Sequence, residues 1–193
     1  MAIRSLLKDR RGISAVEFGL IAPAMCMTLL ALGDICHTAY VQGLLDGEMQ
    51  KVARESAIEG GALKAEEIDA RMRAMVRSIS GDATVETTRQ TFPTFQAIAP
   101  ERFSDDNGNN QRDAGECFDD VNGNRAWDLR PFRTGQGGAN DVTVIRAVAT
   151  WPRLFPLGGF LGLPDDQVIA SETVLKNQPF AVRNEPTPEP VCT

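Results

Sequence analysis

The stretch Ile13–Asp34, ISAVEFGLIAPAMCMTLLALGD, decides the architecture of this 193-residue chain. Its first 21 residues, up to Gly33, carry one charged side chain, Glu17. At about 1.5 Å of rise per residue, a helix over this run is roughly 31 Å long, close to the thickness of a bilayer core. We therefore expect a membrane-spanning helix, with a kink at Pro23 of the kind that membrane helices tolerate.

A basic segment precedes this run. Residues 1–12 hold four basic side chains and one acid, namely Arg4, Lys8, Arg10, Arg11 and Asp9. Because basic flanks of a membrane span stay in the cytoplasm, the chain from about Tyr40 onward is expected outside it. A conventional secretory signal cleaved near Thr38 and Ala39 is the alternative, but such signals have a shorter apolar core and a clearer small-residue cleavage site.

The junction between leader and apolar run carries a more specific pattern. Gly12 ends the leader, Glu17 is the fifth residue after it, and Phe18 follows. This G-x-x-x-x-E-F arrangement resembles type IV prepilins, which a membrane aspartyl peptidase cuts after the glycine. Cleavage would create an ammonium group at Ile13, about one turn from Glu17, which could neutralise a carboxylate that is costly in a membrane. The alternative is an acid favoured by the dipole of the helix N-terminus.

The wider segment Arg10–Asp34 resembles the TadE-like family, minor pilins of the tight-adherence (Tad, type IVb) pilus. The resemblance rests on the Arg-rich leader, on Val-Glu-Phe at 16–18 and on Ala-Pro at 22–23. It is strong over residues 10–40 and loose beyond. Asp34-Ile35-Cys36 departs from the family, whose members often carry Glu and an aromatic residue there, and this leaves the processing site unaffected.

Composition excludes other classes of protein. With one histidine, His37, the chain lacks the ligands and bases of a zinc hydrolase or a Ser-His-Asp hydrolase, so we expect no catalysis. A net charge of −6 argues against a nucleic-acid partner. Removal of residues 1–12 changes this charge to (20 − 4) − (26 − 1) = −9.

Beyond the span, periodicity predicts an α+β domain. Apolar residues at helical spacing extend the first helix to about Ala57, where Gly60-Gly61 breaks it, and a second helix is expected within Lys64–Ser80. The apolar faces of both helices are expected to pack on the domain core. The alternative is that the apolar face of the first helix contacts other pilin helices. Strands of a small antiparallel sheet are expected at Thr84–Thr91, Asp141–Trp151, Gln167–Leu175 and Pro179–Arg183. The proline-rich tail, residues 184–193, is expected to be extended.

An acidic loop, residues 104–128, holds seven acids against two arginines. Its first part places oxygen-bearing residues at positions 1, 3, 5, 7, 9 and 12 of a calcium loop. These residues are Asp105, Asn107, Asn109, Gln111 (through its carbonyl), Asp113 and Glu116. Asn110 stands where such loops usually have glycine, and asparagine tolerates a left-handed backbone better than most residues. Calcium with a structural role is the predicted cofactor, magnesium fits less well, and a metal-free turn region is the alternative.

A second, poorer register begins at Asp120. It continues with Asn122, Asn124, the carbonyl of Ala126, and Asp128. Its twelfth position is Pro131, so it is incomplete unless a distant acid contributes. The flanking segments are not convincing helices, which favours dockerin-like or isolated calcium loops over an EF-hand.

The four cysteines fall into two pairs. Cys26 and Cys36 lie in or at the end of the apolar helix, where we expect small packing residues. Cys117 and Cys192 lie in the part expected outside the cytoplasm, where disulfides form. A Cys117–Cys192 bond is predicted there, the alternative being free thiols or intermolecular pairs.

An apolar segment, LFPLGGFLGL at 154–163, interrupts the expected strands. It is either a buried connection or an exposed tip that contacts a membrane or a partner pilin.

The sequence thus predicts a cytoplasmic leader (1–12), a membrane and pilus-assembly helix (13–37) and a periplasmic α+β domain (38–193). By resemblance, the chain is expected to be a single-pass inner-membrane protein of bacteria, a pseudopilin that takes part in assembly of a Flp-type pilus, with incorporation into the pilus left open. The expected partners are the prepilin peptidase, other minor pilins, the major pilin, the inner-membrane assembly platform and membrane lipid. The alternative function is a calcium-dependent adhesin at a pilus tip or cell surface.

Overall fold

The structure is a computed structural model that describes residues 13–58, 64–155, 159, 162–179 and 188–192. It divides into two compact units. The first joins the described part of Met1–Tyr40 to Pro152–Gln167, and the second comprises Val41–Trp151 and Val168–Thr193. The expected leader, the Gly60-Gly61 break and most of the strand expected at Pro179–Arg183 lie outside the described residues.

The first helix, α2 (Ile13–Ser56), is continuous through Pro23 and changes character along its length. Up to Tyr40 its large apolar side chains are exposed, with Leu20 at 77%. From Val41 onward one stripe becomes fully buried at a spacing of three to four residues, which is the period of a helix face. This stripe consists of Val41, Leu45, Met49 and Val52. The helix therefore changes from an exposed apolar segment to a core helix at the position where the sequence predicted the end of the span.

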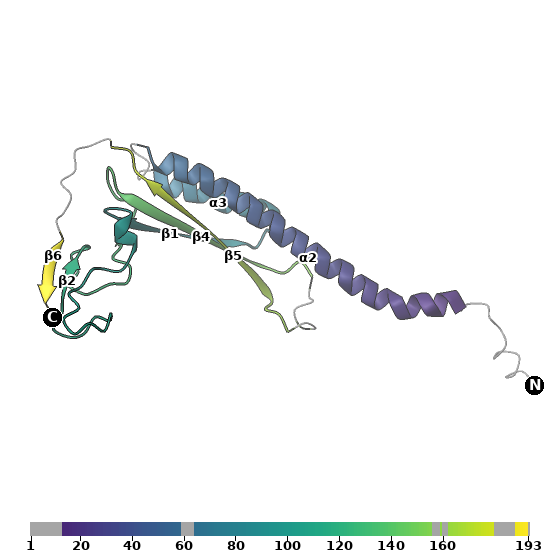
Figure 1. Ribbon diagram of the computed structural model, residues 1–193. Coiled ribbons are helices and arrows are strands. Elements are labelled where there is room, and N and C mark those ends of the chain that lie inside the picture. The colour runs from purple at the N-terminus through teal and green to yellow at the C-terminus, as the bar shows by residue number, and fades with distance from the viewer. Residues whose placement is uncertain (1–12, 59–63, 156–158, 160–161, 180–187, 193) are drawn as a thin grey trace, which may run out of the picture. The chain divides into compact units, whose positions relative to one another are not determined.

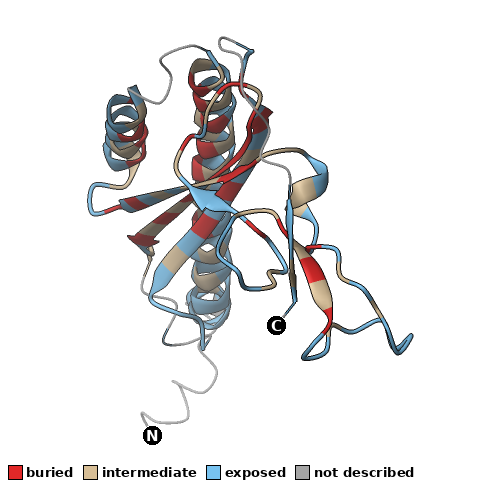
Figure 2. Ribbon diagram, turned by 90° about the vertical axis from the view of Figure 1, so that its left-hand side faces the viewer, coloured by how far each residue is buried: buried red, intermediate tan, exposed pale blue. Residues whose placement is uncertain are grey.

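The core of the second unit joins this stripe to a second helix and a sheet. Helix α3 (Ala65–Ile79) contributes Ile68, Met72 and Val76, as its predicted stripe requires. The sheet contributes a matching layer, centred on Ile145 and Trp151. Figure 2 shows the buried residues on the faces where helices and sheet meet. A bidentate ion pair between Arg89 and Asp69, with N–O distances of 2.8 and 2.6 Å, joins the sheet to α3.

The sheet has four strands in the order β3-β1-β4-β5. They are β1 (Thr84–Phe92), β3 (Arg133–Thr134), β4 (Val142–Pro152) and β5 (Asp166–Lys176). Strand β1 pairs antiparallel with β4 from Thr84↔Thr150 to Phe92↔Val142. The α+β class and three of the predicted strands are therefore confirmed, within a residue or two of their expected ends.

A second, two-stranded sheet was not anticipated. Strand β2 (Cys117–Asp120) lies beside β6 (Glu189–Cys192) (Figure 1). The two strands pair antiparallel, with Cys117 opposite Cys192. The expected extended tail thus ends in a strand. The acidic loop is also not one continuous loop, because β2 divides it into two.

Candidate functional site

The membrane candidate is the N-terminal part of α2. Within the described residues, one helix is long and apolar enough to cross a membrane, by length and composition, and none of its apolar window is buried. Of the predicted processing site, Ile13 begins the helix, and Glu17 and Phe18 are exposed on it. Gly12 lies outside the described residues. Cys26 and Cys36 are free and exposed on the same helix.

The first acidic loop, Asp105–Glu116, is organised around three carboxylates. Asp105 accepts hydrogen bonds from the backbone N–H groups of Gly108, Asn109 and Asn110 at 2.7 to 3.1 Å. Asp113 accepts the side-chain amides of Asn107 and Asn109, both at 2.7 Å. Glu116 closes the loop, because its two oxygens accept the N–H groups of Asp106 and Asp113 at 3.1 and 2.8 Å.

The backbone of this loop agrees with the predicted register. Asn110, at the sixth position, has φ +58°, a left-handed conformation that glycine and asparagine adopt more readily than other residues. Gln111, at the seventh, donates its N–H to the side-chain oxygen of Asn109 at 2.7 Å. The structure therefore brings the predicted residues into one ring of short polar contacts.

The second loop, Asp120–Asp128, repeats most of these contacts at the same positions. Asp120 accepts the N–H groups of Gly123 and Arg125 at 2.7 and 2.8 Å. Asp128 accepts the side-chain amides of Asn122 and Asn124 at 2.8 and 2.7 Å. The sixth residue, Arg125, has φ +60°, the same left-handed backbone as Asn110.

Glu101 takes the place of the missing twelfth residue. Its two carboxylate oxygens accept the N–H groups of Val121 and Asp128 at 2.8 and 2.9 Å. These donors occupy the second and ninth positions of the loop, the same positions that bind Glu116 in the first. Glu101 and Glu116 are also similarly buried, at 3% and 5% exposure. The distant acid that the second register required is therefore Glu101.

Backbone pairing carries Glu101 to this position. Ser104 donates its N–H to the carbonyl of Cys117 at 2.8 Å, and Asp119 donates to that of Arg102 at 2.9 Å. Residues 102–104 thus run antiparallel to β2, which sets Glu101 beside Asp120. The indole N–H of Trp127 fixes the same residue by donating to the Glu101 carbonyl at 2.9 Å.

Burial raises the pKa of the Glu101 carboxyl, because a buried carboxylate loses hydration. The N–H groups of Val121 and Asp128 act in the opposite direction, and the charges of Asp120 and Asp128 add to the increase. The second loop therefore concentrates negative charge around a buried acid.

These loops offer the oxygen ligands that calcium prefers, carboxylates together with amide carbonyls. Within the described part of the chain, no three His, Cys, Asp or Glu side chains converge closely enough to hold a metal ion by themselves. Their carboxylates are instead occupied by backbone N–H groups and asparagine amides. Calcium binding stays a prediction, and it would require Asn107 and Asn109, or Asn122 and Asn124, to contribute oxygen.

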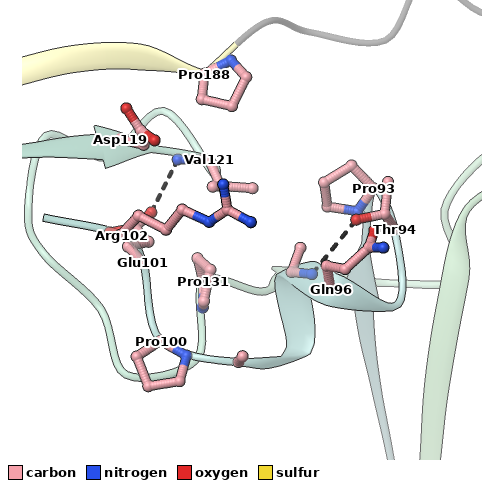
Figure 3. Close-up of a pocket in the computed structure, with 12 residues that line it drawn as sticks. Pro93, Thr94, Gln96, Pro100, Glu101, Arg102, Asp119, Val121, Pro131 and Pro188 are labelled. Atoms are coloured by element: carbon pink, nitrogen blue, oxygen red, sulfur yellow. Dashed lines mark hydrogen bonds between the residues drawn. The ribbon is translucent and has the colours of Figure 1, made fainter.

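A pocket of about 480 Å³ adjoins the second loop. Figure 3 shows that Glu101, Arg102 and Val121 form one side of it, with the Glu101–Val121 hydrogen bond at its edge. Four proline rings also line it, those of Pro93, Pro100, Pro131 and Pro188. The sequence did not predict this pocket, because its lining comes from four separate stretches of chain, at 93–102, 119–121, 131 and 188.

A disulfide joins Cys117 to Cys192 across β2 and β6, as predicted from the cysteine pairs. It fixes the strand that separates the two acidic loops.

Comparison with known proteins supports the resemblance found in the N-terminal segment. Residues 12–57 match the family model of TadE-like proteins. The match covers α2 from its first residue to its last and begins at the expected cleavage glycine. No match was found among curated proteins or among solved structures.

Proposed function

Starting from the TadE-like segment at residues 12–57, which associates the chain with the Tad pilus system, we propose that it is a membrane-anchored minor pilin of that pilus. In this role a prepilin peptidase removes residues 1–12, and α2 remains as anchor and assembly helix. The chain has no catalysis of its own. It acts by packing among other minor pilins and the major Flp-type pilin at the inner-membrane assembly platform, with its second unit in the periplasm.

The continuous α2 is the observation that carries this proposal. An apolar N-terminal part of which no residue in the membrane-length window is buried needs a membrane or other pilin helices as its surroundings, because so much apolar surface is unfavourable in water. The same helix supplies the core stripe of the second unit from Val41 onward. Anchor and folded domain are therefore one element, as a pilin requires.

Glu17 is the residue that would interact with the new N-terminus after cleavage. It is the one charged side chain between Ile13 and Gly33. Cleavage after Gly12 would place an ammonium group at Ile13, four residues earlier on the same helix. That group, on the same or a neighbouring subunit, offsets the cost of a carboxylate in the membrane.

The decisive experiment is the intact mass of the protein isolated from its native host. We expect loss of residues 1–12 and Ile13 as the new N-terminus in the wild type, and retention of the leader in Gly12→Asp. Gly19→Ala is the matched control, because a Cβ at Gly19 meets no atom within 4 Å, and it should be processed normally. A wild-type chain that keeps Met1, or is cut near Ala39, contradicts the proposal.

A second function, calcium-dependent binding at a pilus tip or cell surface, is favoured by the duplicated acidic loops. Two loops with the same contacts, each closed by a buried glutamate, are more than an exposed polar turn requires. Calcium would order both loops, and weak sites would fill at millimolar extracellular concentrations.

Calcium and chelator should therefore shift the melting temperature of the full chain in lipid nanodiscs in opposite directions. The shift should shrink in Asp105→Ala/Asp113→Ala and persist in Asp165→Ala/Asp166→Ala, which removes exposed acids outside the loops. An adhesin role further requires that loop variants assemble pili yet lose surface binding. A melting temperature that does not change with calcium excludes calcium-dependent binding and does not affect the minor-pilin proposal.

A further inference from the structure

The connection between β4 and β5 is closed at its base by Arg153. The backbone N–H of Arg153 donates to the carbonyl of Asp165 at 3.0 Å. Its guanidinium Nε donates to the carbonyl of Pro164 at 2.7 Å. The two ends of the connection therefore meet at one side chain, and the apolar residues Leu154 and Leu163 lie beyond that closure.

The same arginine fixes the connection to α2. Its Nη1 lies 2.6 Å from the Asp34 carboxylate, to which Gln167 also donates at 3.0 Å. Asp34 is 8% exposed, so this is a largely buried ion pair. Asp34 is also the first charged residue after Glu17 along the helix. The base of the connection is thus held at the point where the apolar run ends.

One side chain beyond this base, that of Phe155, packs against the apolar run. The Phe155 ring has its Cε2 3.2 Å from where a Cβ on Gly33 would be, so it packs against the last residue of the run. Leu154 and Leu163 are 52% and 46% exposed. No residue from Leu154 to Leu163 is ionisable.

We propose that Leu154, Phe155 and Leu163 form a second membrane contact, which inserts into the lipid interface beside the end of the span. This inference rests on the proposed anchoring of α2 in a bilayer. Lipid is the occupant because this surface continues the exposed apolar surface of the helix, where Leu32 and Ile35 flank Asp34 at 55% and 65% exposure. Arg153, Asp34 and Gln167 supply the polar belt expected at headgroup level.

The contact gives the protein two attachments to the membrane, a span and an adjacent interfacial patch. A span alone leaves a helix free to rotate about its axis. Because the patch is attached to α2 at Gly33 and Asp34, its contact with lipid would fix the rotation of the helix relative to the bilayer surface. The remaining helix faces are then left for pilin partners.

Site-directed spin labelling of the full chain in nanodiscs of phosphatidylcholine and phosphatidylglycerol tests this proposal. Cys26→Ser and Cys36→Ser remove the free thiols, and single cysteines are then placed by Leu154→Cys or Leu163→Cys. Leu29→Cys is the reference for the span, at 59% exposure, and Leu129→Cys replaces a similarly exposed leucine directly after the second acidic loop, at 65%. Collisions with oxygen report lipid, and collisions with a soluble nickel complex report water.

We expect labels at 154 and 163 to resemble the label at 29, with a several-fold higher oxygen-to-nickel ratio than the label at 129. Nickel access equal to that at 129, with 29 still in lipid, overturns the membrane contact and leaves the anchor intact. Shielding from both reagents indicates a protein partner and also overturns it. A water-exposed label at 29 overturns the contact together with the proposed anchoring.

Discussion

The two acidic loops, Asp105–Glu116 and Asp120–Asp128, make the same contacts from different sequence patterns. In each, the first aspartate binds backbone N–H groups, the ninth binds two asparagine amides, and a buried glutamate binds the N–H groups of positions two and nine. The first loop finds its glutamate within its own twelve residues, whereas the second receives Glu101 from upstream. A loop of this kind is therefore defined by the position of its closing carboxylate in space. The position of that residue in the sequence can differ.

The comparison also shows what the two closures share. Both glutamates are buried, and each satisfies two N–H groups that would otherwise have no acceptor in the loop. An unsatisfied buried donor costs about 1–3 kcal/mol. The glutamates are therefore structural whether or not a cation binds.

Loss of the disulfide should have the largest effect, and it should affect both loops together. Cys117→Ser/Cys192→Ser removes a cross-link between residues 75 positions apart, which should lower the free energy of unfolding by about 4 kcal/mol. Chemical denaturation of the full chain in nanodiscs measures this. Cys26→Ser/Cys36→Ser is the control and should leave the midpoint unchanged, because both thiols are free and exposed. Equal midpoints for all three proteins would show that β2 is held without the bond.

Removal of the closing glutamates tests whether the loops are equivalent. Glu101→Ala and Glu116→Ala should each destabilise the fold by about 1–3 kcal/mol, since each leaves two N–H groups unpaired. If both loops bind calcium, each variant should also reduce the stoichiometry from two ions to one in calorimetric titration.

Glu172→Ala, an exposed acid on β5, is the matched control and should change neither quantity. A Glu101→Ala variant with unchanged stability and stoichiometry would mean that the second loop does not depend on its upstream acid.

Substitution of the sixth residue of each loop by glycine should stabilise the fold, whereas loss of the closing glutamates should destabilise it. Arg125→Gly relieves a left-handed backbone in a residue that disfavours it, and should stabilise the fold by up to about 1 kcal/mol. Asn110→Gly should gain less, because asparagine already tolerates this conformation. Gly108→Ala, at φ +75°, should destabilise and serves as the reverse control. Denaturation midpoints that rank Asn110→Gly above Arg125→Gly would contradict the equivalence of the two backbones.

The smallest effect concerns pH. Because the pKa of Glu101 is raised in the folded state, its protonated form favours folding. That contribution is fully present below the ordinary pKa of glutamate and is lost as pH rises through the raised value. In chelator, wild type should therefore gain stability on acidification relative to Glu101→Gln, as measured by denaturation at several pH values. Parallel pH profiles for the two proteins would exclude the shift.

The features that were predicted correctly from the sequence are those that show a regular period or spacing of residues. The apolar run, the stripe from Val41 to Val52 and strand β4 were each identified because burial imposes a period of 3.6 or 2 on apolar residues. The residues that contact one another in the first loop were identified because its whole register lies within twelve residues, and their role as calcium ligands stays a prediction. The Cys117–Cys192 pair followed from the number of cysteines in one compartment.

The features that were not predicted from the sequence show no regular period or spacing of residues. Glu101 closes the second loop only because residues 102–104 pair with β2, and that pairing involves too few residues to leave a pattern. Strand β6 ends a proline-rich tail, which reads as extended chain without a partner. The pocket and the contact of Arg153 with Asp34 join residues far apart in sequence, and a single sequence carries no information about such proximity.

The disulfide has a topological consequence. It closes a covalent ring over residues 117–192, which contains the second acidic loop along with β4 and β5 and leaves the first loop outside. A protease that cuts after Arg125 opens the ring but releases no fragment until the protein is reduced. A cut after Arg112 separates the chain at once into two covalently independent pieces. Two loops with the same internal contacts thus differ in whether the molecule survives a break in them.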